Sequence, residues 1–301
     1  MLAFCEFASR NEVGPDGQRR YLPVFRLKRI ADYSILDALM DEQIRAVARK
    51  HLPDSVRKPL GALAGRFKTG VVQPLQGFIF DLQGGRFNAD GCTFAIPKDI
   101  TTRAYRACFL NGAYESEERD LVRKWVRPED SVIELGACMG IVSCTTNKLL
   151  KDKSRHVVVE ANPFCIPALY RNKELNQSGF LIEHCAVHKD PEVTFYVHPV
   201  WVVGGTYQRP TERPFRLPAK SLRQLDQERG PFTVLVIDIE GGEKDVFEDS
   251  IEILKRYRLV IVELHEFALG QEGVERCREI MRQSGLELVG TCGITEAWQR
   301  K

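Results

Sequence analysis

The sequence lacks long hydrophobic runs, and their absence excludes one class of protein. No stretch of 18 consecutive apolar side chains occurs among the 301 residues, and a helix that spans a bilayer needs roughly that many. The N-terminus also lacks the basic stretch and apolar core of a secretory signal. We therefore expect a protein without a membrane span and with a cytoplasmic location.

Paired cysteines and a strong net charge are missing as well. The nine cysteines form no C-x-x-C pair, which argues against a disulfide framework and against a zinc site. Several of them, such as Cys144 and Cys185, lie within apolar runs and are expected to be small buried side chains. The net charge of +2 gives no indication of nucleic-acid binding.

The segment Val132–Gly140, which reads VIELGACMG, is the most informative part of the chain. It predicts a buried strand and a tight glycine turn, and His156–Glu160 predicts a second strand that ends in a carboxylate. This order is half of a nucleotide-binding βαβ unit. The turn holds only Gly136 and Gly140, whereas a dinucleotide pyrophosphate requires the pattern G-x-G-x-x-G.

The charge at this turn favours a different nucleoside. Glu134 precedes the glycines, where it would repel phosphate and attract a cation. S-adenosylmethionine (SAM) carries an ammonium and a sulfonium group and no phosphate. Glu160, 20 residues beyond Gly140, is placed to accept hydrogen bonds from both ribose hydroxyls. A glycine turn is often only tight packing and a strand-end carboxylate often only solvated, but both features in this order indicate a nucleoside site.

Strands alternate with helices along the remaining chain, which predicts an open, mostly parallel sheet. The expected helices cover 115–126, 141–150, 164–175, 243–256 and 271–283. The expected strands cover 132–135, 156–160, 180–184, 193–197, 233–239, 259–264, 286–290 and 294–298, with a loop at 204–206. Before this pattern, residues 31–50 have the spacing of a helix outside the sheet, and 78–82 with 92–96 predict a hairpin or two short strands.

Two later segments place acidic and imidazole side chains at strand ends, where such sheets bind ligands. In Ile237–Glu243 (IDIEGGE) we assign Asp238 and Glu240 to the site and Glu243 to helix capping. The following strand leads into His265. A lone histidine is more often structural than catalytic, but its position beside the same crevice makes this one a candidate.

Six short motifs follow one another in an order that resembles a known family, the FkbM-type SAM-dependent methyltransferases. They are Gly112–Glu115 (GAYE), Glu134–Gly140 (ELGACMG), Glu160–Pro163 (EANP), Cys185–Val187 (CAV), Ile237–Glu243 (IDIEGGE) and Glu263–His265 (ELH). The resemblance covers roughly residues 110–265. The family's glycine turn reads D-V-G-A-N-x-G, and this chain has Glu134 for the aspartate and Cys138 for the asparagine. The acid is kept and the amide is lost.

The resemblance implies a fold and a division of the chain. The fold is the α/β class I methyltransferase fold, a Rossmann-like, seven-stranded, mostly parallel sheet with helices on both faces and an antiparallel last strand. We expect this SAM-dependent methyltransferase domain over 78–301. Residues 1–77 lie outside the resemblance. From its own pattern we expect this accessory region to be an N-terminal helical and β-hairpin extension, and a homo-oligomer could form through its helix.

The resemblance also implies SAM as the cofactor and a hydroxyl group as the methyl acceptor. The acceptor would be a secondary metabolite or a sugar of a glycan or glycolipid. The residues that would bind SAM are Tyr114, Glu115, Glu134, Gly136, Ala137, Cys138, Met139, Gly140, Glu160, Ala161, Asn162, Cys185, Ala186, Val187 and Asp238. The aromatic residues of segment 185–232 are expected to shape the acceptor pocket; they include Tyr196, Trp201 and Tyr207.

Methyl transfer from a sulfonium to an oxygen is an in-line displacement, so the protein must mainly hold the two groups in contact. A hydroxyl is a weak acid, and His265 is the first candidate for its base because the unperturbed histidine pKa lies near neutrality. Asp238 could act as base, orient His265 or contact the methionyl amine, and Glu240 is the third catalytic candidate. We expect no tightly held metal, because paired His or Cys ligands at metal spacing are absent, although Asp238 and Glu240 could hold Mg²⁺.

Two alternatives stay open at this point. A nicotinamide-dependent oxidoreductase would share the βαβ unit, but the dinucleotide glycine pattern is missing. A non-catalytic nucleoside-binding or interaction scaffold is the other alternative. The presence of Glu134, Glu160, Asp238 and His265 together argues against a decayed site.

Overall fold

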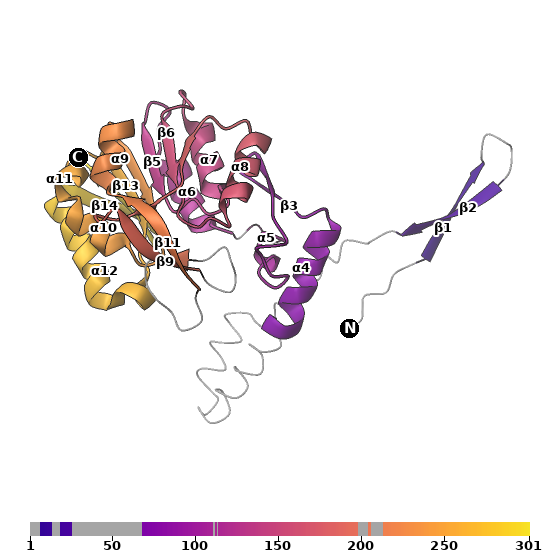
Figure 1. The fold of residues 1–301 in the computed structure, drawn as a ribbon. Coiled ribbons are helices and arrows are strands. Elements are labelled where there is room, and N and C mark those ends of the chain that lie inside the picture. Colours follow the sequence, from indigo (N-terminus) through magenta and orange to yellow (C-terminus); the bar gives the residue numbers. More distant parts are fainter. Residues whose placement is uncertain are drawn as a thin grey trace, which may run out of the picture. The chain divides into compact units, whose positions relative to one another are not determined.

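The computed structural model describes residues 7–13, 19–25, 68–110, 112, 114–197, 204–205 and 213–301. The chain divides into two compact units, residues 1–66 and 67–301. In the first unit, strand β1 (Phe7–Val13) pairs antiparallel with β2 (Arg19–Phe25) (Figure 1). The helix expected over 31–50 lies outside the described residues.

A seven-stranded sheet forms the centre of the second unit. Its strands are β5 (Val132–Leu135), β6 (His156–Val159), β7 (Leu181–Glu183), β12 (Val234–Ile237), β13 (Leu259–Glu263), β14 (Leu286–Cys292) and β15 (Thr295–Arg300). They lie in the order β7-β6-β5-β12-β13-β15-β14, and β15 runs in the direction opposite to the other six strands. This confirms the predicted class I methyltransferase fold with its antiparallel last strand. The central strands are apolar runs because both of their faces are buried.

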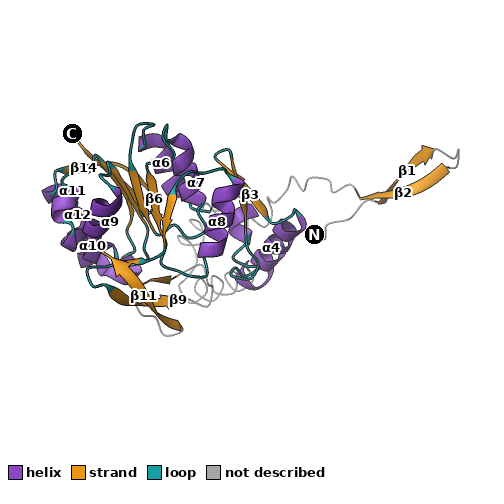
Figure 2. Ribbon diagram, turned by 45° about the horizontal axis from the view of Figure 1, so that its top comes forward, coloured by secondary structure: helices purple, strands orange, loops and turns teal. Residues whose placement is uncertain are grey.

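Helices cover both faces of this sheet (Figure 2). One face packs against α6 (Ser116–Trp125), α7 (Ile141–Leu149) and α8 (Ile166–Leu175). The other packs against α9 (Leu222–Arg229), α10 (Glu243–Asp249), α11 (Ile251–Leu254) and α12 (Glu266–Gln283). Successive residues of each strand point to opposite faces of the sheet. On β5, Val132 packs on one face and Ile133 on the other. Within the described part of the chain, no helix is both long and apolar enough to cross a bilayer.

The helices after β12 and β13 differ in detail from the expected ones. The single helix expected over 243–256 is two short helices, α10 and α11, because the chain leaves helical geometry at Ser250 (φ −122°). Helix α12 begins at Glu266, before the expected 271, and holds a kink at Gly270 with φ +66°. Glycine adopts that conformation without steric cost.

The segment before the repeating pattern contains one wrong prediction. Residues 78–82, expected as a strand, end the helix α4 (Gln73–Leu82), which follows a π-helical turn η1 (Lys68–Val72). The hairpin is instead formed by β3 (Arg86–Ala89) and β4 (Cys92–Ala95). A short apolar run does not distinguish helix from strand by periodicity alone, and here packing decides.

Packing joins α4 to the second unit. Phe80 contacts the ring of Phe109 in α5 (Ala107–Leu110) with centroids 5.7 Å apart, and Asp81 accepts two hydrogen bonds from Arg106. The second unit therefore starts at residue 67, ahead of the boundary at 78 that the sequence suggested.

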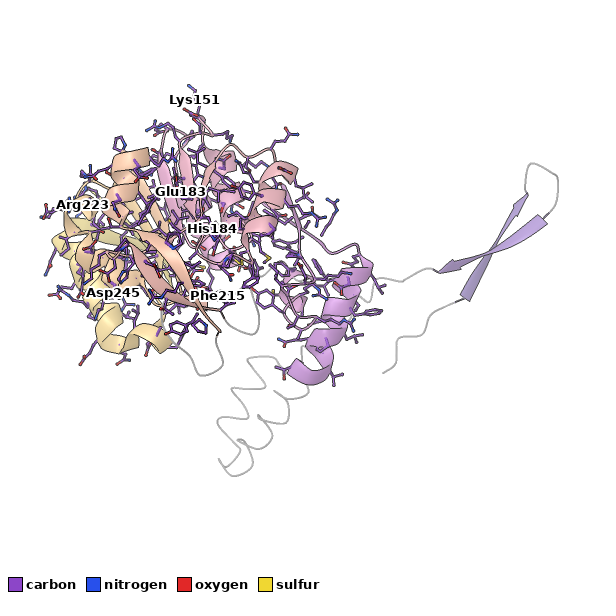
Figure 3. The ribbon with its side chains drawn as sticks, viewed as in Figure 1. Lys151, Glu183, His184, Phe215, Arg223 and Asp245 are labelled. Carbon is purple, nitrogen blue, oxygen red and sulfur yellow. The ribbon has the colours of Figure 1, made fainter. Side chains whose placement is uncertain are left out.

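A small second sheet lies beside the main one, in the order β10-β9-β11-β8. Its strands are β8 (Ala186–Val187), β9 (Glu192–Val197), β10 (Gly204–Gly205) and β11 (Arg213–Lys220). The expected strand at 193–197 is confirmed, and the expected loop at 204–205 is a short strand paired with β9. Glu183, labelled in Figure 3, ties the two sheets together because its carboxylate binds Lys220 of β11 at 3.0 Å and Arg229 of α9 at 2.8 Å.

Candidate functional site

A pocket opens at the carboxyl ends of the central strands. The chain passes from β5 to β6 on one side and later places β12 on the other side of β5, and ligands bind where strand order reverses in this way. The pocket is lined by Tyr105, Tyr114, Glu115, Gly136, Cys138, Val159, Glu160, Ala161, Asn162, Cys185, Ala186, Val187, Phe195, Asp238, Ile239 and Glu240. Eleven of the fifteen residues predicted to bind SAM are thus brought to one cavity.

The glycine turn after β5 forms the floor of the pocket. Gly136 has φ +92°, and a Cβ atom at this position would lie 1.6 Å from the carbonyl oxygen of Asp238 at the end of β12. Only glycine allows the backbones of these two strand ends to approach so closely. From the far side, the buried amide of Asn172 on α8 donates to the Met139 carbonyl at 2.9 Å and fixes the turn.

Glu160 lies where β6 ends and joins two loops of the pocket. Its carboxylate oxygens accept the backbone N–H of Cys138 at 2.6 Å and that of Asn162 at 2.5 Å. Burial raises the pKa of this carboxyl to about 7, although the backbone hydrogen bonds oppose the shift. Each carboxylate oxygen has a second lone pair that can still accept a hydroxyl hydrogen bond.

The four other predicted SAM-binding residues lie behind the pocket surface. Glu134 is buried within β5, where its carboxylate accepts a hydrogen bond from Ser143 and lies 3.3 Å from His156. It is therefore not among the lining residues, because its position on the strand directs it into the helix-covered face. The remaining three are also buried; they are Ala137, Met139 and Gly140.

Three residues of the pocket wall have strained backbone conformations. Glu115, Cys138 and Glu240 have φ of 49°, 48° and 56°, a region that side-chain-bearing residues rarely adopt. All three line the pocket. Such conformations persist where the surrounding structure enforces them, and they concentrate at ligand sites.

His265 lies behind the wall, among carboxylates. Its Nδ1 is 3.0 Å from Glu243, and its Nε2 is 3.6 Å from Asp238 and 3.4 Å from Glu263. Burial alone would lower the pKa of this imidazole, but the carboxylates outweigh burial and raise the pKa to about 11. Carboxylates that favour the protonated imidazole oppose its action as a base, and the role of His265 as the base stays a prediction.

Glu243 does not have the helix-capping role that the sequence suggested. Its side chain is fully buried, and one oxygen accepts the backbone N–H of Ile239 at 3.3 Å and of Gly241 at 3.1 Å. The same oxygen holds His265 in place. Two groups of metal-type ligands share Asp238, one with Glu243 and His265 and one with Glu118 and Glu263, with donor atoms within 4.8 Å of one another in each group.

Comparison with known families identifies the family of this chain. The sequence model of the methyltransferase FkbM domain matches residues 134–288, just over half of the chain. The chain belongs to the FkbM methyltransferase family. Methyltransferases of this family use SAM as their methyl donor. The matched region contains the end of β5 and all of β6, β12 and β13, and residues at the ends of β5, β6 and β12 line the pocket of this FkbM methyltransferase.

Several solved structures are similar to this FkbM methyltransferase at low sequence identity. Precorrin-6y C5,15-methyltransferase from Geobacter metallireducens GS-15 is 9% identical over 69% of this chain and 94% of its own, with a TM-score of 0.41. A putative O-methyltransferase from Klebsiella pneumoniae is 14% identical over 61% and 78%, with a TM-score of 0.38. An O-methyltransferase from Bacillus cereus in complex with SAH is 14% identical over 61% and 79%, with a TM-score of 0.37. A search of curated proteins gave no match.

Sequence reasoning missed four lining residues of the FkbM methyltransferase pocket, namely Tyr105, Val159, Phe195 and Ile239. Val159 and Ile239 directly precede or follow predicted site residues, so adjacency could have indicated them. Phe195 lines the pocket in place of the expected Tyr196, because successive residues of β9 point to opposite faces. Trp201 and Tyr207 lie outside the described residues.

The close approach at Gly136 predicts that Gly136→Ala, which adds one methyl group, lowers the free energy of unfolding by an unusually large amount. Gly84 has the same φ of +92° but no atom within 4 Å of an added Cβ, so it is a matched control. We expect Gly84→Ala to cost roughly 1–2 kcal/mol of unfolding free energy from backbone strain alone. Gly136→Ala should cost more than about 4 kcal/mol, because it also displaces the end of β12. Urea unfolding measures both, and equal losses would contradict the close approach.

Proposed function

We propose that this chain is a SAM-dependent O-methyltransferase whose acceptor is a hydroxyl of a sugar or of a secondary metabolite. One observation carries the proposal. Four carboxylates line the pocket and no Lys or Arg is found among the described lining residues; the four are Glu115, Glu160, Asp238 and Glu240. Such a pocket attracts a cationic ligand and repels a phosphorylated one.

The charge of the pocket distinguishes the proposal from the alternatives. A nicotinamide dinucleotide would bring a pyrophosphate towards these carboxylates, and the described lining residues include no basic side chain to receive it. SAM brings an ammonium and a sulfonium. A non-catalytic scaffold would not need a strained backbone at three residues of one pocket wall. The three strained residues are Glu115, Cys138 and Glu240.

In the proposed complex, the ribose hydroxyls donate to Glu160 and the flat base lies between apolar residues. Ala186 and Phe195 supply apolar surface on the side of the small sheet. The positively charged methionine part then faces Glu115 and Asp238. Burial raises the pKa of Glu115 to about 8, and a bound cation would favour its ionised form.

The reaction itself is a single displacement. A lone pair of the acceptor oxygen forms a bond to the methyl carbon while the carbon–sulfur bond breaks, which leaves neutral S-adenosylhomocysteine. The hydroxyl proton passes to a carboxylate on the wall, where Asp238 and Glu240 are the two nearest the strand end. Positioning accounts for most of the rate acceleration, because binding holds the two reactants together and makes a bimolecular reaction effectively unimolecular.

The first prediction concerns SAM affinity. Glu160→Gln removes the charge that receives the ribose hydroxyls, and each charge-assisted hydrogen bond contributes about 1.5–3 kcal/mol. We therefore expect SAM affinity in calorimetric titration to fall at least about tenfold. Glu183→Gln, at the end of the neighbouring strand β7 and outside the pocket, is the control and should bind SAM as the wild type does. Wild-type affinity in Glu160→Gln would remove Glu160 from the cofactor site.

The raised pKa of Glu160 predicts a pH dependence of binding. Because SAM favours the ionised carboxylate, affinity should be constant above about pH 7 for this group and should weaken as pH falls through 7. For the titration of one group, SAM affinity should change by at most about tenfold per pH unit. The Glu160→Gln protein, which lacks this titration, should show a flatter profile. If both proteins give the same profile between pH 5 and 8, another group controls it.

Acceptor chemistry is tested by turnover of methyl-labelled SAM with a panel of sugars, glycolipids and natural-product alcohols. The expected product is a methyl ether, with the label on oxygen by NMR. Replacement of an accepted hydroxyl by hydrogen in the acceptor should abolish labelling. Label on nitrogen or carbon would contradict O-methylation while leaving SAM binding intact.

A further inference from the structure

The wall behind the pocket contains more buried negative charge than its one imidazole balances. Glu118 of α6, Asp238 after β12, Glu263 at the end of β13 and His265 converge there from three separate elements. We propose that these four side chains bind a divalent metal ion at the edge of the pocket. The role of the ion in catalysis rests on the proposed function, but its binding does not.

The spacing of the three carboxylates fits a shared ion, and His265 adjoins two of them. The carboxylate oxygens of Glu118, Asp238 and Glu263 lie within 4.8 Å of one another. The His265 Nε2 atom lies 3.6 Å from Asp238 and 3.4 Å from Glu263, which is longer than a good N–H···O hydrogen bond of about 2.7–3.2 Å. Two ligand atoms that each lie about 2.1 Å from one ion are separated by roughly 3–3.5 Å.

Glu118 supplies an independent indication of a missing partner. Its side chain is buried, with 5% of the residue exposed, and among the described contacts no hydrogen bond or ion pair reaches it. Asp238 Oδ1 is shielded from solvent and accepts no hydrogen bond, and the nearby His265 Nε2 lies 3.6 Å from it. Buried carboxylates are normally paired or bound to metal, because an unpaired charge is costly to desolvate.

Glu243 arranges His265 as a metal ligand. The buried Glu243 carboxylate is fixed by two backbone N–H groups and lies 3.0 Å from His265 Nδ1. When Nδ1 donates its hydrogen to Glu243 and a metal ion takes the place of the proton on Nε2, the Nε2 lone pair faces Asp238 and Glu263. Histidine ligands of metal sites commonly use this arrangement, in which the second ring nitrogen is held by a carboxylate.

The ligand set indicates the type of ion. Three carboxylates with one imidazole and no thiolate favour a hard or borderline divalent ion such as Mn²⁺ or Mg²⁺. Asp238 and Glu263 are 22% and 24% exposed, so the site is accessible, and Asp238 also lines the pocket. An ion bound there would lower the pKa of an acceptor hydroxyl, and Glu240 on the pocket wall would receive the hydroxyl proton.

The test measures Mn²⁺ binding to the full chain, stripped with chelator, by electron paramagnetic resonance without SAM or acceptor. We expect one bound Mn²⁺ per chain in the wild type. Glu118→Gln and Glu263→Gln should each weaken binding by more than about tenfold. Glu252→Gln removes a charge from a well-exposed glutamate on α11 and should bind as the wild type does. Parallel titrations with Mg²⁺ and Zn²⁺ establish which ion is preferred.

Thermal unfolding gives a second readout. Ligands that bind only the folded state raise its melting temperature, so Mn²⁺ should stabilise the wild type and Glu252→Gln but neither cluster variant. If the wild type binds Mn²⁺ no more tightly than Glu118→Gln and Glu263→Gln, protons alone balance the cluster and the proposal is wrong. Titration of SAM into the chelated wild type is independent of this result, so a failed metal site leaves the cofactor proposal standing.

Discussion

The close approach of the turn after β5 to the end of β12 is the constraint on which the site depends. Gly136 lies against the carbonyl of Asp238, and the backbone after β5 must then turn with positive φ. Because β6 adjoins β5 on the other side, the same turn reaches Glu160 through the Cys138 amide. The contact that Gly136 permits therefore places Glu160, the proposed ribose acceptor, on one wall and Asp238 and Glu240, the proposed reacting groups, on the other.

Charge is the second determinant, and it acts through burial. Glu160 accepts backbone hydrogen bonds that offset part of its desolvation, whereas Glu118 has no such partner among the described contacts. Burial is the main cause that raises the pKa of Glu118 and of Asp238 well above the usual range. Such a pocket favours positive charge, and we propose that the methionine part of SAM supplies it in the pocket and a metal ion behind the pocket.

The sequence predicted the parts of this arrangement that are local. Strand ends, glycine turns and the carboxylate 20 residues after Gly140 are fixed by spacing, and parallel strands bring their ends to one edge. The convergence of Glu118 with Glu263 could not be read from spacing, because the two residues come from different elements. The surroundings of His265 were hidden for the same reason, so its pKa could not be anticipated. The choice between Phe195 and Tyr196 depended on strand register, which a short alternating strand leaves open.

A crystal structure of the full chain with S-adenosylhomocysteine tests the central claim most directly, because it locates the nucleoside and its sulfur together. The account predicts both ribose hydroxyls within hydrogen-bond distance of Glu160. It also predicts the sulfur on the side of the pocket formed by Asp238 and Glu240. A nucleoside bound elsewhere, or one whose ribose makes no contact with Glu160, would contradict it.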